Sequence, residues 1–110
     1  MSVEDVSKID SIGIPSDNPN TVSLAISDHL TWDVPIEEHL YKIQEKINTY
    51  ISFIESGEIY DVFPASQGTT RKIIEIYFKY DLPEQVVSFL DQISNVLQSI
   101  NIELRYQTLK

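Results

Sequence analysis

The sequence contains no cysteine, only three glycines and no long apolar run. The absence of cysteine excludes a disulfide framework, thiol catalysis and thiolate metal sites, and it is typical of proteins in a reducing compartment. No run approaches the ~18 apolar residues that a membrane helix needs. The opening residues, MSVEDVSKID, are acidic and lack the apolar segment of a secretion signal. We therefore expect a cytoplasmic protein that does not enter a membrane.

Basic residues are also scarce, with 8 Lys and Arg against 17 Asp and Glu, for a net charge of −9. Residues 1–70 hold 12 acids and 3 bases, whereas residues 71–110 hold 5 of each. Phosphate backbones attract cations, so this balance argues against nucleic-acid binding. Complementary charge favours a protein partner with a basic surface. Net charge also keeps a protein soluble without any partner.

The few glycines do not form a phosphate-binding loop or a nucleophile turn, and both predicted helix starts are acidic. Phosphate sites use glycines and free amides at a helix start, so nucleotide binding is disfavoured. We predict no cofactor and no catalytic residues, and we regard an enzyme as the less favoured interpretation. The length indicates one domain over 1–110, with residues 1–8 as a loose lead-in.

The hydrophobic pattern predicts four strands and two helices. Apolar residues at every second position indicate strands, and apolar residues three or four apart indicate one-sided helices. In chain order we expect strands at 9–14 and 21–27, a helix at 35–56, a strand at 72–80, a helix over about 84–100 and a strand at 102–108. The fold class is therefore α+β, a two-layer sandwich of order ββαβαβ with both amphipathic helices on one face of a four-stranded sheet. The strand order stays open.

Local signals predict the helix ends. Asp33 is expected to cap the first helix, and Gly57 to end it in the left-handed conformation. Asp81 and Glu84 are expected to form a capping box at the second helix. The connection at 57–71 is expected to be irregular. The polar positions of the first helix, which we expect in solvent, are Glu38, Lys42, Glu45, Lys46 and Ser52.

The densest polar cluster surrounds the start of the first helix and comprises Asp28, His29, Trp32, Asp33 and His39. Two histidines and several carboxylates are possible ligands of a divalent metal. However, the histidines are ten residues apart and no His–Glu–x–x–His pattern is present. The alternative is that Asp33 caps the helix, His39 meets a carboxylate or solvent, and Trp32 closes the edge of the core. We predict no metal site and regard this group as a weak polar cluster.

A possible interaction surface lies on the sheet face that the helices leave uncovered. Odd-numbered side chains of the last two strands point to this face, among them Tyr77, Lys79, Glu103 and Arg105. Tyrosine and arginine are enriched at protein interfaces. The alternative is an ordinary solvated sheet face. The acidic residues of the first helix, Glu37, Glu38 and Glu45, could contribute to a second surface for a basic partner.

Four segments carry a resemblance to a known family. They are SDHLTWD at 27–33, IQEKIN at 43–48, FIESGEIY at 53–60 and IEIYFKY at 74–80. Together they resemble a family of short bacterial proteins that is known only as a domain of unknown function, over about residues 9–106. The resemblance implies a complete small bacterial protein, and it implies no activity and no site residue.

Three functions fit these observations. The first is a non-catalytic protein-interaction module, which could act on a partner with a basic surface or as a homo-oligomer. The second is an immunity or inhibitor protein for a basic toxin or nuclease, in which Glu37, Glu38 and Glu45 meet the cationic site. The third is a small metal-dependent enzyme that uses Asp28, His29 and His39.

Overall fold

The computed structural model describes residues 8–33 and 35–109, so residues 1–7 of the predicted lead-in lie outside the described part. Four strands form one sheet in the order β1-β2-β3-β4. They are β1 (Ser11–Gly13), β2 (Thr21–Asp28), β3 (Arg71–Phe78) and β4 (Ile102–Thr108). β1 pairs antiparallel with β2, whereas β2, β3 and β4 are parallel. The sheet is therefore mixed, with the short strand β1 at one edge.

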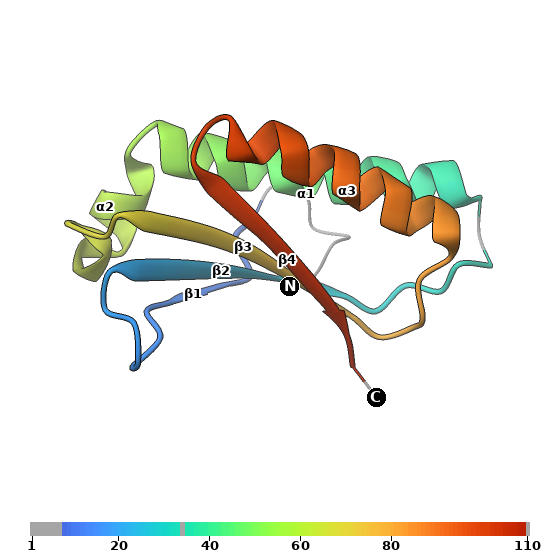
Figure 1. Cartoon of the computed structure of the whole chain (residues 1–110), viewed down its shortest axis with the longest axis horizontal. Helices are drawn as coiled ribbons and strands as arrows, with labels where there is room; N and C mark the ends of the chain where they lie inside the picture. Colours follow the sequence, from blue (N-terminus) through green and yellow to red (C-terminus); the bar gives the residue numbers. More distant parts are fainter. Residues whose placement is uncertain (1–7, 34, 110) are drawn as a thin grey trace.

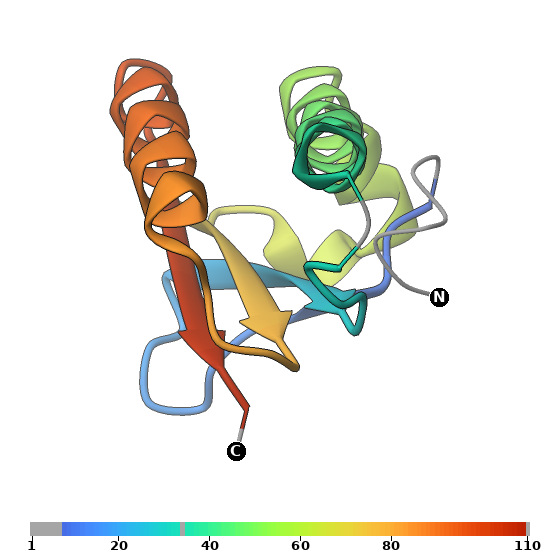
Figure 2. The same ribbon diagram turned by 90° about the vertical axis from the view of Figure 1, so that its right-hand side faces the viewer.

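Two long helices, α1 (Ile36–Glu55) and α3 (Glu84–Gln98), lie on one face of the sheet (Figures 1 and 2). Parallel neighbours need a crossover connection, and these helices supply it between β2 and β3 and between β3 and β4. The predicted α+β class, the order ββαβαβ and the two-layer arrangement are confirmed. Among residues 8–33 and 35–109, every helix falls short of the length and apolar content that a membrane span requires.

The core lies between the sheet and the two helices. The pairing places Leu24, Ile74 and Leu104 side by side, and all three are buried. From the helices, Tyr50 and Leu90 are fully buried in the same core. The even-numbered positions of β3 and β4 therefore face the helices from Ile74 and Ile102 onward, as the alternation predicts. Ile73 departs from the pattern, because it belongs to the other face and is still only 4% exposed.

The predicted acidic caps are wrong at both long helices. The N-cap residues are Pro35 and Pro83, and neither helix has a side-chain cap. Both prolines have extended ψ angles, of 120° and 153°. The chain enters each helix at the proline, which leaves Asp33 and Asp81 two residues outside the first turn. The prediction for Gly57 is confirmed, since its φ of 82° is left-handed.

The connection at 57–71 is more regular than predicted. It contains the short helix α2 (Glu58–Val62) and a 3-10 turn, η1 (Pro64–Ser66). Ile59 of α2 is fully buried, and the buried Ser66 hydroxyl donates to the Phe63 carbonyl at 2.7 Å. A single helical turn thus satisfies backbone groups while it seats Ile59 in the core. Alternation and composition alone do not reveal such short turns.

Candidate functional site

The first candidate is the sheet face opposite the helices, called here the open face. Figure 2 shows both long helices on the other side of the sheet. The pairing places Glu75 opposite Arg105 and Tyr77 opposite Gln107. The predicted surface residues Tyr77, Glu103 and Arg105 therefore lie together on neighbouring strands. Lys79 lies one residue beyond the end of β3 and is exposed.

Hydrogen bonds and ion pairs link the strands across the open face. Arg71 Nη2 donates to Glu103 Oε1 at 2.6 Å, and Arg105 Nε donates to the other oxygen of Glu103. Gln107 Nε2 donates to Glu75 Oε2 at 2.9 Å. The hydrogen bond from Arg71, and then Arg105, lowers the pKa of Glu103. Exposed pairs of this kind add little stability, so these charges are available to a partner.

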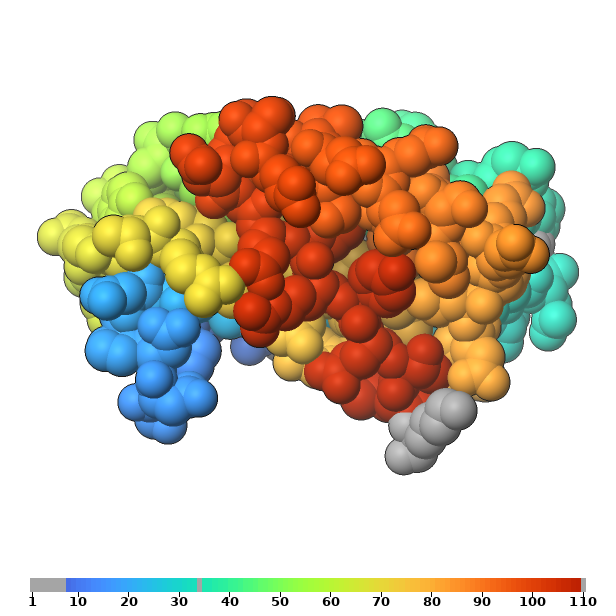
Figure 3. Space-filling view, in the orientation of Figure 1, coloured from blue at the N-terminus to red at the C-terminus, as the bar shows by residue number. Residues whose placement is uncertain are grey.

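The open face is balanced in charge, unlike the rest of the chain. Its charged members within the strands are two arginines, Arg71 and Arg105, and two glutamates, Glu75 and Glu103, and Lys79 lies just beyond the end of β3. Partial burial, followed by the negative charge of Glu75, raises the pKa of Tyr77. The turn before β2 and the end of β4 both project below the sheet (Figure 3). A partner on the open face would therefore sit between two projections.

The second candidate is the histidine cluster, formed by Asp28, Trp32 and His39. His39 Nε2 and Asp28 Oδ2 are 2.6 Å apart, and both side chains are fully buried. Trp32 stacks on His39 with ring centroids 3.7 Å apart. The other oxygen of Asp28 accepts from the Leu30 amide at 3.1 Å. The cluster joins the carboxyl end of β2 to the first turn of α1.

Two ring nitrogens of the histidine cluster have no hydrogen-bond partner among the residues that the structure describes. His39 Nδ1 and Trp32 Nε1 are both buried without one. A cavity of about 100 Å³ lies beside His39 and is lined also by Thr31, Glu38 and Lys42. The fully buried imidazole has no direct access to solvent through its side chain. The geometry is that of an imidazole held in place by Asp28 and Trp32.

The other two residues of the predicted polar cluster, His29 and Asp33, do not share the burial of Asp28 and His39. His29 and Asp33 are both exposed, whereas Asp28 and His39 are buried. Within residues 8–33 and 35–109, no group of three or more His, Cys, Asp or Glu side chains is arranged to hold a metal ion. The structure thus divides the five predicted residues into a cluster of three, in which Asp28 and His39 are buried and Trp32 is half-buried, and two exposed residues.

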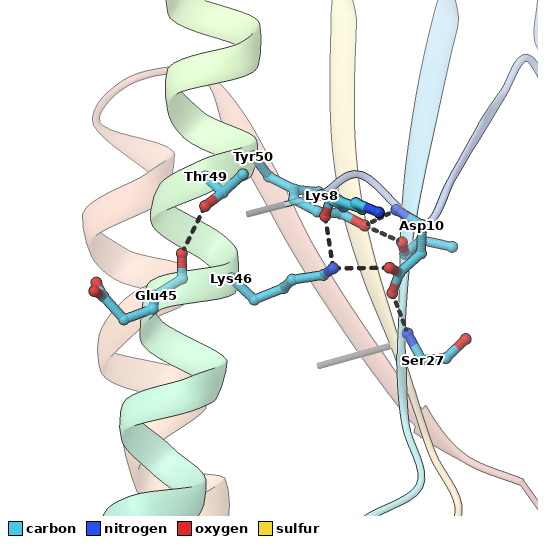
Figure 4. Close-up of polar contacts among 8 residues, drawn as sticks. Lys8, Asp10, Ser27, Glu45, Lys46, Thr49 and Tyr50 are labelled. Carbon is cyan, nitrogen blue, oxygen red and sulfur yellow. Dashed lines mark hydrogen bonds and ion pairs between the residues drawn. The ribbon is translucent and has the colours of Figure 1, made fainter. Parts of the chain in front are cut away.

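Sequence reasoning missed a third group, the lysine cluster of Asp10, Lys46 and Tyr50 (Figure 4). Lys46 Nζ lies 2.7 Å from Asp10 Oδ1 and donates to the Lys8 carbonyl at 2.6 Å. Tyr50 accepts from the Asp10 amide at 2.8 Å and donates to the Ala25 carbonyl at 2.5 Å. These bonds fasten the segment before β1 to α1 and β2.

The prediction that Lys46 faces solvent is therefore wrong, since its side chain is fully buried. The signal was its spacing, because Lys46 follows Ile43 by three residues and precedes Tyr50 by four, which puts it on the apolar stripe. Its buried charge is tolerated because Asp10 neutralises it. Burial also raises the pKa of the Tyr50 hydroxyl well above its usual value.

The three acidic residues singled out on α1 do not form one patch. Glu37 and Glu38 are exposed, and Glu45 is half-buried. Tyr41 donates to Glu45 at 3.2 Å, and Asn48 donates to it at 3.4 Å. Residues seven apart share one side of a helix, so Glu38 and Glu45 lie on a common side while Glu37 lies about 100° away.

These features define a small α+β protein with a one-sided mixed sheet, an open polar face and two buried polar clusters. The chain belongs to a family of unknown function (DUF6572), whose model matches residues 1–110. Searches of curated proteins and of solved structures found no match. The expectation of a family of unknown function is therefore confirmed, and the family model brings no activity with it.

Proposed function

We propose that this protein is a non-catalytic protein-interaction module whose open face binds a second copy of the chain. The observation that carries the proposal is the charge balance of this face in a chain of net charge −9. Two copies repel each other over most of their acidic surface. That repulsion is smallest where arginines and glutamates alternate, so the open face is the favoured place of contact.

The chemistry of the face supports this interpretation. Arg71 and Arg105 share one carboxylate, Glu103, so a second glutamate from a partner copy could bind either guanidinium. Tyr77 presents a half-buried aromatic ring on the central strand β3. Ile73 lies on the same strand and the same side but is buried, so it offers a partner little apolar surface. Aromatic and arginine side chains are typical of interface centres.

The test is the oligomeric state measured by light scattering over a range of protein concentrations and salt concentrations. We expect a dimer that weakens in high salt. The variant R105E should raise the dissociation constant of the dimer by about tenfold or more. Each copy would then place three carboxylates against those of the other. K42E makes the same change of charge on α1, away from the open face, and should leave the dimer intact. A monomer at every concentration, or equal effects of R105E and K42E, would contradict the proposal.

An inhibitor of a basic protein is a second possible function, supported by the exposed carboxylates Glu37 and Glu38. Replacing Glu37, Glu38 and Glu45 by glutamine should then weaken binding to a cationic protein, whereas it should leave the open-face dimer unchanged. Of the three residues considered for a metal-dependent enzyme, the structure brings together only His39 and Asp28, and His29 is exposed. We propose no reaction for this pair. A cytoplasmic location fits the cysteine-free composition and is part of the proposal.

A further inference from the structure

A groove of about 330 Å³ runs between α1 and α3, on the opposite side of the molecule from the open face. Two of its lining residues, Ile47 and Leu97, are buried, and Val96 is 65% exposed. Half-buried apolar side chains complete its walls. The apolar lining residues are Ile47, Ile51, Phe89, Ile93, Val96 and Leu97. An apolar groove between two helices is a surface that amphipathic helices bind in other proteins.

The lining of the groove contains no charged residue, but acidic residues lie at its two ends. Glu37 precedes the lining residue Gln44 by seven positions, and Glu55 follows the lining residue Ile51 by four. Residues at these spacings share one side of a helix, so both carboxylates lie on the groove side of α1. Both are exposed. The groove is thus mainly apolar, with the uncharged amides of Gln44, Asn48 and Gln92 also in its lining, and negative at its ends.

Among residues 8–33 and 35–109, the lysines and arginines of the two long helices do not lie on the groove side. α3 contains no lysine or arginine, and the last turn of each long helix has no basic residue. Lys46 of α1 is buried against Asp10, and Lys42 lines the cavity beside His39. Both helices cross between parallel strands in the same direction, so their carbonyl ends, which are partly negative, lie at the same end of the groove.

We propose that the groove binds an amphipathic helix of a partner protein, with apolar residues between α1 and α3 and lysines or arginines near Glu37 and Glu55. These two glutamates are roughly 27 Å apart along the helix axis, so about five turns of a partner helix reach from one to the other. A second copy is a poor occupant, because its own long helices are acidic and would be repelled. This site is separate from the open face.

The experiment uses two fluorescent model helices with the same leucine face, one with lysine and one with glutamate on the polar face. Anisotropy of the labelled peptides, titrated with the full chain, reports binding. We expect the lysine peptide to bind, with weaker binding in high salt, and the glutamate peptide not to bind. Equal binding of the two peptides would overturn the proposal, because acidic ends would then play no part.

Two matched variants test the position of the site. V96D places a charge on the groove wall and should weaken binding of the lysine peptide by about tenfold or more. V62D makes the same change on α2 at a residue that is equally exposed, 63% against 65%, and should bind as the wild type does. E37Q with E55Q should weaken binding and reduce its salt dependence. Equal binding by V96D and V62D would overturn the proposal.

A last comparison separates this site from the open face. R105E should leave peptide binding unchanged, even if it dissociates a dimer. Loss of peptide binding in R105E would place the peptide on the open face and overturn the groove proposal. Dissociation of the wild-type dimer by V96D, without any binding of the lysine peptide, would show that a second copy occupies the groove and would likewise overturn it.

Discussion

The lysine cluster and the histidine cluster are both buried polar groups on α1, but they differ in how fully their hydrogen bonds are made. In the lysine cluster, the ammonium, the carboxylate and the phenol all have partners. In the histidine cluster, His39 Nδ1 and Trp32 Nε1 have none. A buried polar group without a partner costs roughly 1–3 kcal/mol. The histidine cluster therefore carries a free-energy cost that the lysine cluster avoids.

The two clusters also differ in what they connect. The pair Lys46 and Asp10 is separated by 36 residues and fixes the segment before β1. The pair His39 and Asp28 is separated by 11 residues and closes the connection from β2 to α1. One cluster thus holds an edge of the sheet in place, and the other shapes a single crossover. The predictions below test this difference.

The largest effect is expected from K46M. It removes the ammonium and leaves the Asp10 carboxylate nearly buried without its cation, which costs roughly 3–5 kcal/mol of unfolding free energy for pairs of this kind. Urea unfolding followed by circular dichroism measures the change. K42M, on the same helix at a partly exposed lysine, is the control and should change stability by less than about 0.5 kcal/mol. Equal losses in both variants would mean that the buried ion pair is not the cause.

A smaller loss, of about 1–3 kcal/mol, is expected from H39F. The phenyl ring can still stack on Trp32, but Asp28 loses its partner at Oδ2. Since Nδ1 of His39 makes no hydrogen bond within the described part of the chain, H39F leaves only the Asp28 carboxylate without a partner. A double-mutant cycle with D28N should give a coupling of about 1 kcal/mol or more, since the two side chains act as a pair. Strict additivity in that cycle would show that the contact contributes nothing.

The smallest loss is expected from Y50F, about 0.5–1.5 kcal/mol at neutral pH, because the substitution keeps the buried ring and removes only hydrogen bonds between neutral groups, to the Asp10 amide and the Ala25 carbonyl. Burial raises the pKa of Tyr50 above its unfolded value of 10.0. The native state therefore keeps its proton where the unfolded state releases it, so stability falls as pH rises above about 10. The free energy of unfolding of Y50F should fall less over that range. The difference in stability between the wild type and Y50F should therefore narrow. A stability difference that stays constant from pH 8 to 11 would show that the titration of Tyr50 is not linked to folding.

Alternation and helical periodicity were sufficient to predict the element order, the one-sided covering of the sheet and the open face that carries Tyr77 and Arg105. These are local patterns that follow from how side chains alternate along a strand. The strand order could not be predicted, because a connection as long as 57–71 can return the chain to either edge. The Asp10–Lys46 bond was missed for a similar reason, since it joins residues that only the folded chain brings together.

The caps show a different limit. Asp33 and Asp81 have the right side chains in nearly the right places, but Pro35 and Pro83 decide where each helix begins. Within the predicted polar cluster, the sequence indicated which residues are close along the chain without indicating their burial. Asp28 and His39 share the inner side and His29 the outer side, because Asp28 continues the inward-facing positions of β2 and His29 follows it.

The fastening of β1 has a consequence for the order of events during synthesis. β1 pairs with β2 over only three residues, and a short two-stranded ribbon is marginal by itself. Ile12 packs against the core, and further support comes from Lys46 and Tyr50, which leave the ribosome more than thirty residues later. β1 is therefore made before the helix that fastens it, and it gains this support only once α1 has followed, while β3 and β4 are still to be made.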